Sequence, residues 1–148
     1  MSAPAPSRLR LVAYWLTTLL IASEMALGGY WDLARTHYVR AIMDHLGYPL
    51  YMLSVLGFWK IAGAFAIVIP RFTRLKEWAY AGMFFNYSGA AASHLLAGDG
   101  PRGWAGPALF ALISVASWAL RPSSRVLGGS LFAPANPVTS APAHASSL

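Results

Sequence analysis

The stretch that decides the fold runs from Leu50 to Pro70 and reads LYMLSVLGFWKIAGAFAIVIP, with Lys60 as its only charged residue. Twenty helical residues rise about 30 Å, which matches the hydrocarbon thickness of a bilayer. In lipid the backbone must satisfy its own hydrogen bonds, so this run predicts a membrane-spanning helix and not a strand. Three further apolar runs surround it, at residues 11–30, 77–97 and 104–120.

The composition of the whole chain agrees with a membrane location. Its 148 residues are 57% hydrophobic and only 11% charged, and the mean hydropathy is +0.49. A soluble domain carries about 25% charged residues, so a water-soluble enzyme domain and a disordered protein are both excluded. The chain has no cysteine, which excludes disulfides, dithiol redox chemistry, iron–sulfur clusters and thiolate zinc. We therefore expect an all-α integral membrane four-helix bundle in a lipid bilayer.

The basic residues predict the orientation of the four spans. The net charge is +6, but the Lys and Arg residues are dispersed at the ends of the apolar runs, which argues against nucleic-acid binding. With four spans, seven of them fall on one side: Arg8, Arg10, Arg71, Arg74, Lys76, Arg121 and Arg125. Three fall on the other: Arg35, Arg40 and Arg102. The positive-inside rule then places both termini in the cytoplasm and the protein in the cell (inner) membrane.

The segments outside the spans have distinct patterns. Residues 31–49 carry apolar side chains at helical spacing, which predicts a short interfacial helix that lies on the outer membrane surface or caps the bundle, ended by Gly47 and Pro49. Residues 1–10 and the Pro-, Ser- and Ala-rich residues 122–148 predict disorder around a single domain at 11–121. The first run resembles a signal peptide, but Glu24 in the cleavage window favours a retained helix.

Two opposite charges lie inside predicted spans. Glu24 lies about 9 Å and Lys60 about 15 Å below the outer end of their helices, and a lone charge at mid-membrane is costly. We therefore expect them to be partners. Gly57, Gly63 and Ala64 share the helical face of Lys60, and small residues of this kind predict that it faces a neighbouring helix. A structural ion pair, a proton or ligand site, and snorkelling towards the interface all remain open.

Further polar and aromatic residues extend this candidate site. Asn86 is level with Lys60, and His94 is nearer to Glu24, so two polar layers are expected. Tyr80 and Tyr87 are candidates to line a pocket for a planar ligand such as a quinone. His37, His45 and His94 lack the spacing of metal ligands, so no metal site is predicted.

One segment carries a family resemblance. Residues 75–82, LKEWAYAG, resemble the signature of the DoxX-like family of small four-helix membrane proteins through Lys76, Glu77, Trp78, Tyr80 and Gly82. HLGYP at 45–49, KIAGA at 60–64, Pro70, Ser93–His94 and Gly98–Asp99 follow the same pattern, so the resemblance covers about residues 11–121. It implies a four-span bundle. Some relatives look like the membrane subunit of a thiosulfate:quinone oxidoreductase, and others like accessory parts of oxidative-stress or assembly complexes.

Three functions follow as hypotheses. The first is an accessory membrane protein that acts with a protein partner or as a homo-oligomer, because the loops are too short for a soluble active site and no cofactor motif occurs. The second is a quinone-interacting oxidoreductase subunit, with quinone as its cofactor. The third is a small proton-coupled transporter, suggested by the intramembrane Glu24 and Lys60. The catalytic residues, and whether the protein is an enzyme, stay open at this stage.

Overall fold

The chain folds into five helices in a computed structural model that describes residues 7–122, 125 and 126. No strand occurs within these ranges. The helices are listed in chain order: α1 Arg8–Leu33, α2 His37–Leu46, α3 Tyr51–Val68, α4 Thr73–Leu96 and α5 Pro101–Leu120. The expected all-helical bundle with a short helix between its first two long helices is therefore confirmed.

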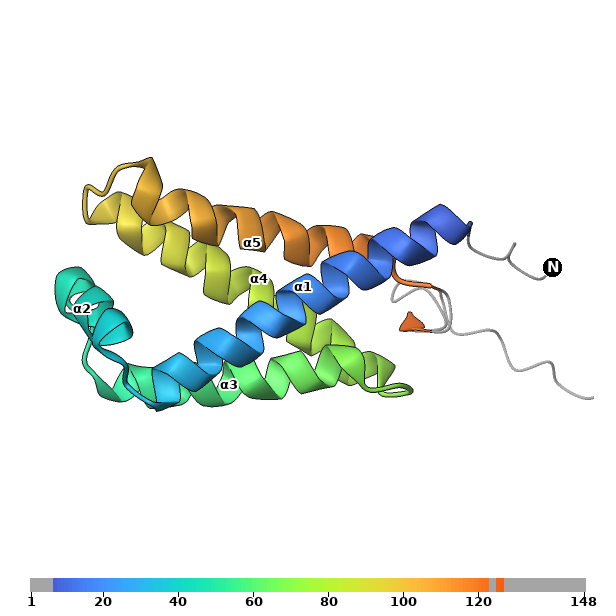
Figure 1. The fold of residues 1–148 in the computed structure, drawn as a ribbon, viewed down its shortest axis with the longest axis horizontal. Coiled ribbons are helices and arrows are strands. Elements are labelled where there is room, and N and C mark those ends of the chain that lie inside the picture. The colour runs from blue at the N-terminus through green and yellow to red at the C-terminus, as the bar shows by residue number, and fades with distance from the viewer. Residues whose placement is uncertain (1–6, 123–124, 127–148) are drawn as a thin grey trace, which may run out of the picture.

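Three of the four long helices are both long and apolar enough to cross a membrane. These are α1, α3 and α5, whose best windows have mean hydropathies of 1.5, 1.7 and 1.4. At 24 residues α4 is long enough, but its polar side chains lower its hydropathy. It nevertheless lies alongside α5 through the bundle (Figure 1), and several of its polar residues contact neighbouring helices, as described below.

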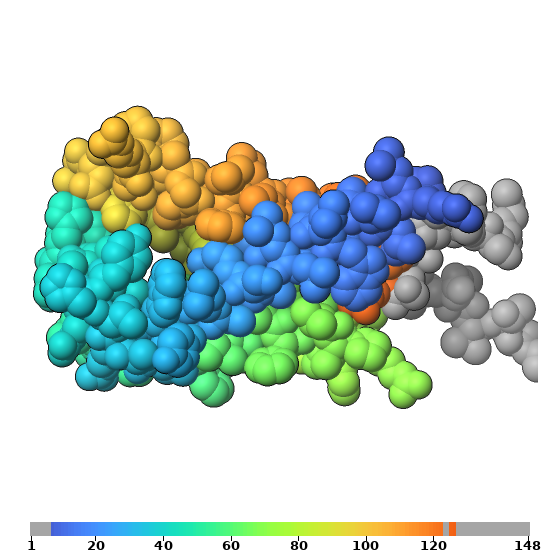
Figure 2. Space-filling model, in the orientation of Figure 1, coloured from blue at the N-terminus to red at the C-terminus, as the bar shows by residue number. Residues whose placement is uncertain are grey.

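The four long helices form a ring in which α1 contacts α3 and α5, and α4 contacts the same two helices. The most extensive contacts are α1 with α3 and α4 with α5. Figure 1 shows that the α1–α3 pair and the α4–α5 pair approach each other at the end of the bundle where α1 starts and α5 finishes. We call this the terminal end. The two pairs diverge at the opposite end, where α2 lies, and Figure 2 shows a gap beside α2 there. We call this the α2 end.

The bundle has an apolar core and an apolar exterior. The core includes Ile21, Met25, Ile67 and Met83, all 3% exposed or less. Large apolar side chains are also exposed on every long helix; examples are Leu16, Phe65, Trp78, Phe85 and Leu112. A soluble protein does not leave so many large apolar residues uncovered, so the outer surface is suited to lipid.

Short polar side chains join three helices inside this core. The Ser117 hydroxyl of α5 lies 2.8 Å from that of Thr18 on α1 and 2.8 Å from that of Tyr80 on α4. All three residues are buried. Interhelical hydrogen bonds of this kind hold membrane helices together where no hydrophobic effect separates protein from lipid.

The helix ends differ from the predicted boundaries by a few residues. The prediction of disorder for residues 1–10 is wrong for Arg8 to Arg10, which form the first turn of α1 with the Ser7 hydroxyl capping the Arg10 amide. Residues 1–6, 123–124 and 127–148 lie outside the described part of the chain. Within the predicted tail, Arg125 contacts the bundle, since it donates to the Tyr14 hydroxyl.

The short helix α2 caps the bundle. Val39 and Met43 are buried on one side of α2 and pack with Leu53 at the start of α3. The helix ends at Gly47, whose φ of +74° is the left-handed conformation that glycine adopts without a Cβ penalty. The predicted end of this helix is confirmed.

Candidate functional site

Lys60 forms an ion pair inside the bundle, but its partner is Asp32. The Lys60 Nζ lies 2.7 Å from Asp32 Oδ2, and the two side chains are 17% and 5% exposed. The sequence placed Asp32 in a loop, whereas α1 continues to Leu33 and carries this carboxylate into the bundle. The expected direct contact between Lys60 and Glu24 is absent, because no ion pair within 4.0 Å joins these two described residues.

Two glycines explain why this pair forms. Gly29 of α1 and Gly57 of α3 pack against each other: a Cβ on Gly29 would come within 2.9 Å of the Gly57 carbonyl, and a Cβ on Gly57 within 2.8 Å of the Gly29 carbonyl. Asp32 and Lys60 each follow one of these glycines by three residues, so they lie on the same faces. The predicted close packing beside Lys60 is thus present, with Gly57 at its centre.

Glu24 lies near the same ammonium group without bonding to it. A Cβ at Gly28 would lie 3.2 Å from Glu24 Oε1 and 3.7 Å from Lys60 Nζ, so both polar groups border the space that this glycine leaves. Glu24 Oε2 is buried and has no hydrogen-bond partner among the described residues. The layer therefore holds two carboxyl groups and one ammonium group.

A lateral pocket opens beside this layer. It has a volume of about 230 Å³ between α1, α3 and α4, and its polar residues are Lys60 and Asn86. These two residues, which the sequence placed at the same depth, thus line one pocket. Trp59 and Trp78, which are 66% and 79% exposed, form part of its wall. The remaining lining is apolar or small and includes Met25, Leu56, Gly63, Gly82 and Met83.

The two tyrosines expected to line a pocket lie elsewhere. Tyr80 is 3% exposed and bonds to Ser117 in the core. Tyr87 is 4% exposed and packs against the Phe110 ring at 5.5 Å. Neither lines the lateral pocket, because the helical period of α4 turns them towards α5 while Trp78 and Asn86 face α3.

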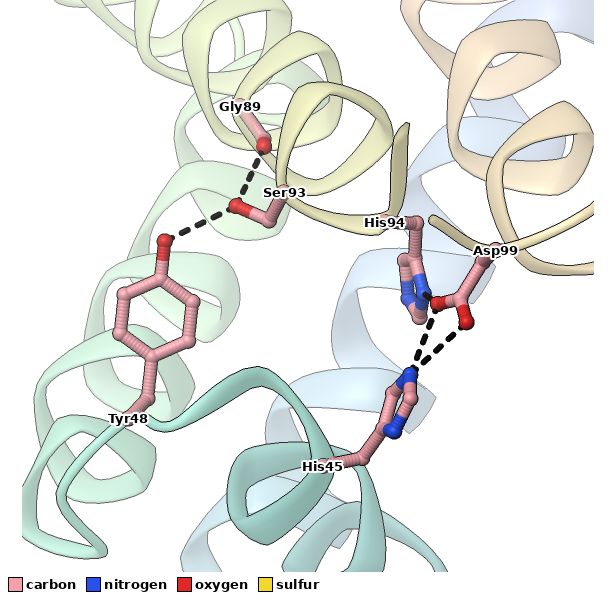
Figure 3. Close-up of polar contacts among 6 residues, drawn as sticks. All are labelled: His45, Tyr48, Gly89, Ser93, His94 and Asp99. Atoms are coloured by element: carbon pink, nitrogen blue, oxygen red, sulfur yellow. Dashed lines mark hydrogen bonds and ion pairs between the residues drawn. The ribbon is translucent and has the colours of Figure 1, made fainter. Parts of the chain in front are cut away.

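A second polar cluster lies at the α2 end and includes His94, whose bonded partner is Asp99 and not Glu24. Figure 3 shows Asp99, in the turn between α4 and α5, bonded to two imidazoles. His45 Nε2 of α2 lies 2.8 Å from Asp99 Oδ1, and His94 Nδ1 of α4 lies 2.6 Å from Oδ2. Beside it the Tyr48 hydroxyl lies 2.8 Å from that of Ser93. The cluster thus ties α2 to α4.

The electrostatics of this cluster centre on Asp99. Hydrogen bonds from His94 and His45 hold the pKa of the Asp99 carboxyl below its usual value. Gly103 on α5 leaves room for the arrangement, since a Cβ there would lie 2.9 Å from Asp99 Cβ and 3.2 Å from His94 Nδ1. The cluster borders an open hollow of about 580 Å³ that Arg102 also lines. Neither this cluster nor any other group of His, Asp and Glu side chains in the described ranges has an arrangement that could hold a metal ion.

The residues of the LKEWAYAG motif have separate structural roles at the terminal end. Lys76, which is fully buried, donates to the carbonyls of Ala66, Ile67 and Ile69 at the end of α3. Glu77 accepts from Trp118 at 2.8 Å and pairs with Arg121 at 2.9 Å. Trp78 and Gly82 border the pocket and Tyr80 bonds in the core.

Sequence reasoning missed Asp32, His45 and Asp99 as site residues. Asp32 had a detectable signal, since it follows Gly29 by three residues, and Lys60 follows Gly57 by the same number. His45 and Asp99 lie in segments that follow the family pattern, but nothing in the sequence pairs them, because they lie 54 positions apart and only the docking of α2 brings them together.

Comparison with known proteins supports the architecture. Residues 15–117, which include the four long helices almost entirely, match the DoxX-like family. No curated protein and no solved structure matches the chain. The match covers more than half of the sequence and contains the lateral pocket and the polar layer, so this multi-pass membrane protein belongs to the DoxX-like family.

Proposed function

We propose that this protein is an accessory membrane subunit that holds a quinone-type ligand in the lateral pocket and presents it to a partner protein. The observation that carries the proposal is that two hydrogen-bond donors, the Lys60 ammonium and the Asn86 amide, line an otherwise apolar pocket. A Lys ammonium has three donors, and Asp32 takes one from Lys60. The other donors of Lys60, with the Asn86 amide, suit the two carbonyl oxygens of a quinone ring.

The size and position of the pocket favour this class of ligand. A volume of about 230 Å³ is below the usual range for drug-sized ligands, so it suits a ring head group and not a whole isoprenoid quinone. Trp59 and Trp78 lie at its exposed edge, where an apolar tail would continue into lipid. Both indoles offer flat faces for stacking on the ring.

The short connections between helices support an accessory role. The longest intervals between the five helices are the four residues at 47–50, 69–72 and 97–100. These turns leave no room for a soluble domain, so the electron donor for any quinone chemistry would be carried by another protein. We also propose cytoplasmic termini in the inner membrane, on the distribution of Lys and Arg. A phosphatase reporter active only outside the cytoplasm, fused after Arg125, should then be inactive.

Ligand binding can be measured directly. The purified protein in lipid nanodiscs is titrated with a short-chain ubiquinone, and tryptophan quenching is recorded. We expect saturable quenching that weakens about tenfold in Lys60→Met and in Asn86→Leu, because each loses one hydrogen bond of about 1.4 kcal/mol. Trp59→Phe and Trp78→Phe should remove most of the quenching amplitude.

The matched control is Phe85→Leu, which alters an exposed apolar residue of α4 outside the pocket. This variant should bind as the unmodified protein does. Equal quenching in all variants would mean that the quinone partitions into the bilayer without a site, and would refute the proposal.

A further inference from the structure

The charges of the polar layer do not balance. In the described part of the chain Glu24 and Asp32 from α1 face one cation, Lys60 from α3, and Lys60 and Asp32 are the charged groups that act on Glu24. Asp32 holds the ammonium at 2.7 Å. With both carboxyl groups ionised the layer would carry one uncompensated negative charge inside the membrane, which is strongly unfavourable.

The geometry identifies the group without a counter-ion. Asp32 is the bonded partner of Lys60, whereas Glu24 Oε2 is buried without a partner among the described residues. The α4 side of the adjoining pocket offers Asn86, which is neutral and adds no positive charge. His94 is bonded to Asp99 and the Lys76 ammonium to α3 carbonyls, so neither of these basic side chains of α4 is bonded to Glu24.

We propose that Glu24, Lys60 and Asp32 form a binding site for one proton, which is held on Glu24. The protonated layer is neutral overall, with a carboxylic acid beside an ammonium–carboxylate pair. Loss of the proton from Glu24 leaves an anion that competes with Asp32 for the Lys60 ammonium. Gly28 makes this competition feasible, because both Glu24 Oε1 and Lys60 Nζ border the space beside it. The site does not require a quinone.

The proposal predicts how many protonated carboxyl groups each variant carries. Infrared spectroscopy of the ligand-free protein in nanodiscs at pH 7 measures this number through the C=O stretch of protonated carboxyl groups. The unmodified protein should show one such group, and Glu24→Gln should show none. Asp32→Asn should also show none, because Glu24 then becomes the only counter-ion of Lys60 and ionises. Lys60→Met should show two, because neither carboxylate keeps a partner.

The control is Asp44→Asn on the exposed side of α2, which should leave the band unchanged. A band that survives in Glu24→Gln, or that is absent from the unmodified protein, would overturn the proposal. A band that appears only when sodium is replaced by choline would also overturn it, since the site would then hold a metal cation in place of the proton. Because quinone is absent, a failure here is distinguishable from a failure of quinone binding.

Discussion

Two lysines of this protein lie inside the bundle, and their surroundings differ. Lys76 at the terminal end is fully buried and has no acidic partner among the described residues, yet its ammonium donates to three carbonyls at the C-terminus of α3. Lys60 in the polar layer donates to one carboxylate and borders a pocket and a second carboxyl group. The donors of Lys76 are all used, which fits a structural cap, whereas Lys60 makes one hydrogen bond within the described ranges, which leaves donors for a ligand.

The two ends of the bundle also differ in the bonds that hold them together. At the terminal end Arg10, Arg121 and Arg125 add further contacts between side chains and helix-end carbonyls. At the α2 end one carboxylate and two imidazoles join α2 to α4. The terminal end is therefore held by many bonds to backbone, and the α2 end by few bonds that depend on protonation.

The largest expected effect is the loss of the α3 cap. Lys76→Met removes three hydrogen bonds to carbonyls at the end of α3, two of them buried, so the free energy of unfolding should fall by about 3 kcal/mol. Thermal unfolding in detergent measures this, with Arg74→Met, an exposed neighbour on the same helix, as the matched control. Equal stability of the two variants would show that Lys76 is not a structural cap.

The next effect tests whether Lys60 and Asp32 act as a pair. Each of Lys60→Met and Asp32→Asn should destabilise the protein by about 2 kcal/mol, less than the 3–5 kcal/mol seen for buried pairs. The loss is smaller because proton uptake by Asp32 in the first variant, or proton release from Glu24 in the second, offsets part of the charge imbalance. The double variant should be more stable than the sum of the two losses predicts. Additive losses would mean that the two groups do not interact.

A similar or slightly smaller effect is expected at the contact that brings this pair together. Gly57→Ala places a Cβ 2.8 Å from the Gly29 carbonyl, so α1 and α3 must separate, at a cost of about 1–2 kcal/mol. Gly82→Ala is the control, because nothing lies within 4 Å of its Cβ position. Comparable melting temperatures for the two variants would contradict the close packing of α1 on α3.

The smallest effect concerns the pH dependence of the α2 end. The folded-state pKa of Asp99 lies below its usual value, so its contribution is present above the unfolded-state pKa and is lost as the pH falls through the folded-state pKa. The stability difference between the unmodified protein and Asp99→Asn should therefore be constant at neutral pH and shrink in acid. Hydrogen exchange of α2 amides measures this, and Asp44→Asn should show no such trend. A difference that grows in acid would reverse the assigned sign.

The sequence by itself determined the helical class, the lipid environment and the approximate limits of the long helices, because these depend on the length and hydropathy of local runs. It also indicated that Lys60 faces a helix, since Gly57 lies one turn away. Helix ends such as those of α1 were less certain, because polar residues at an end are compatible with either a loop or a final turn.

Only the tertiary structure decided which charges meet. Depth along each helix favoured Glu24 as the partner of Lys60, but a flexible lysine side chain reaches past Gly28 and Gly29 to Asp32. The meeting of His45 with Asp99 likewise depends on how α2 docks, and the separation of Tyr80 from the pocket depends on how α4 is rotated against α3 and α5. These are properties of the relative placement of helices, which the local pattern of a single segment does not encode.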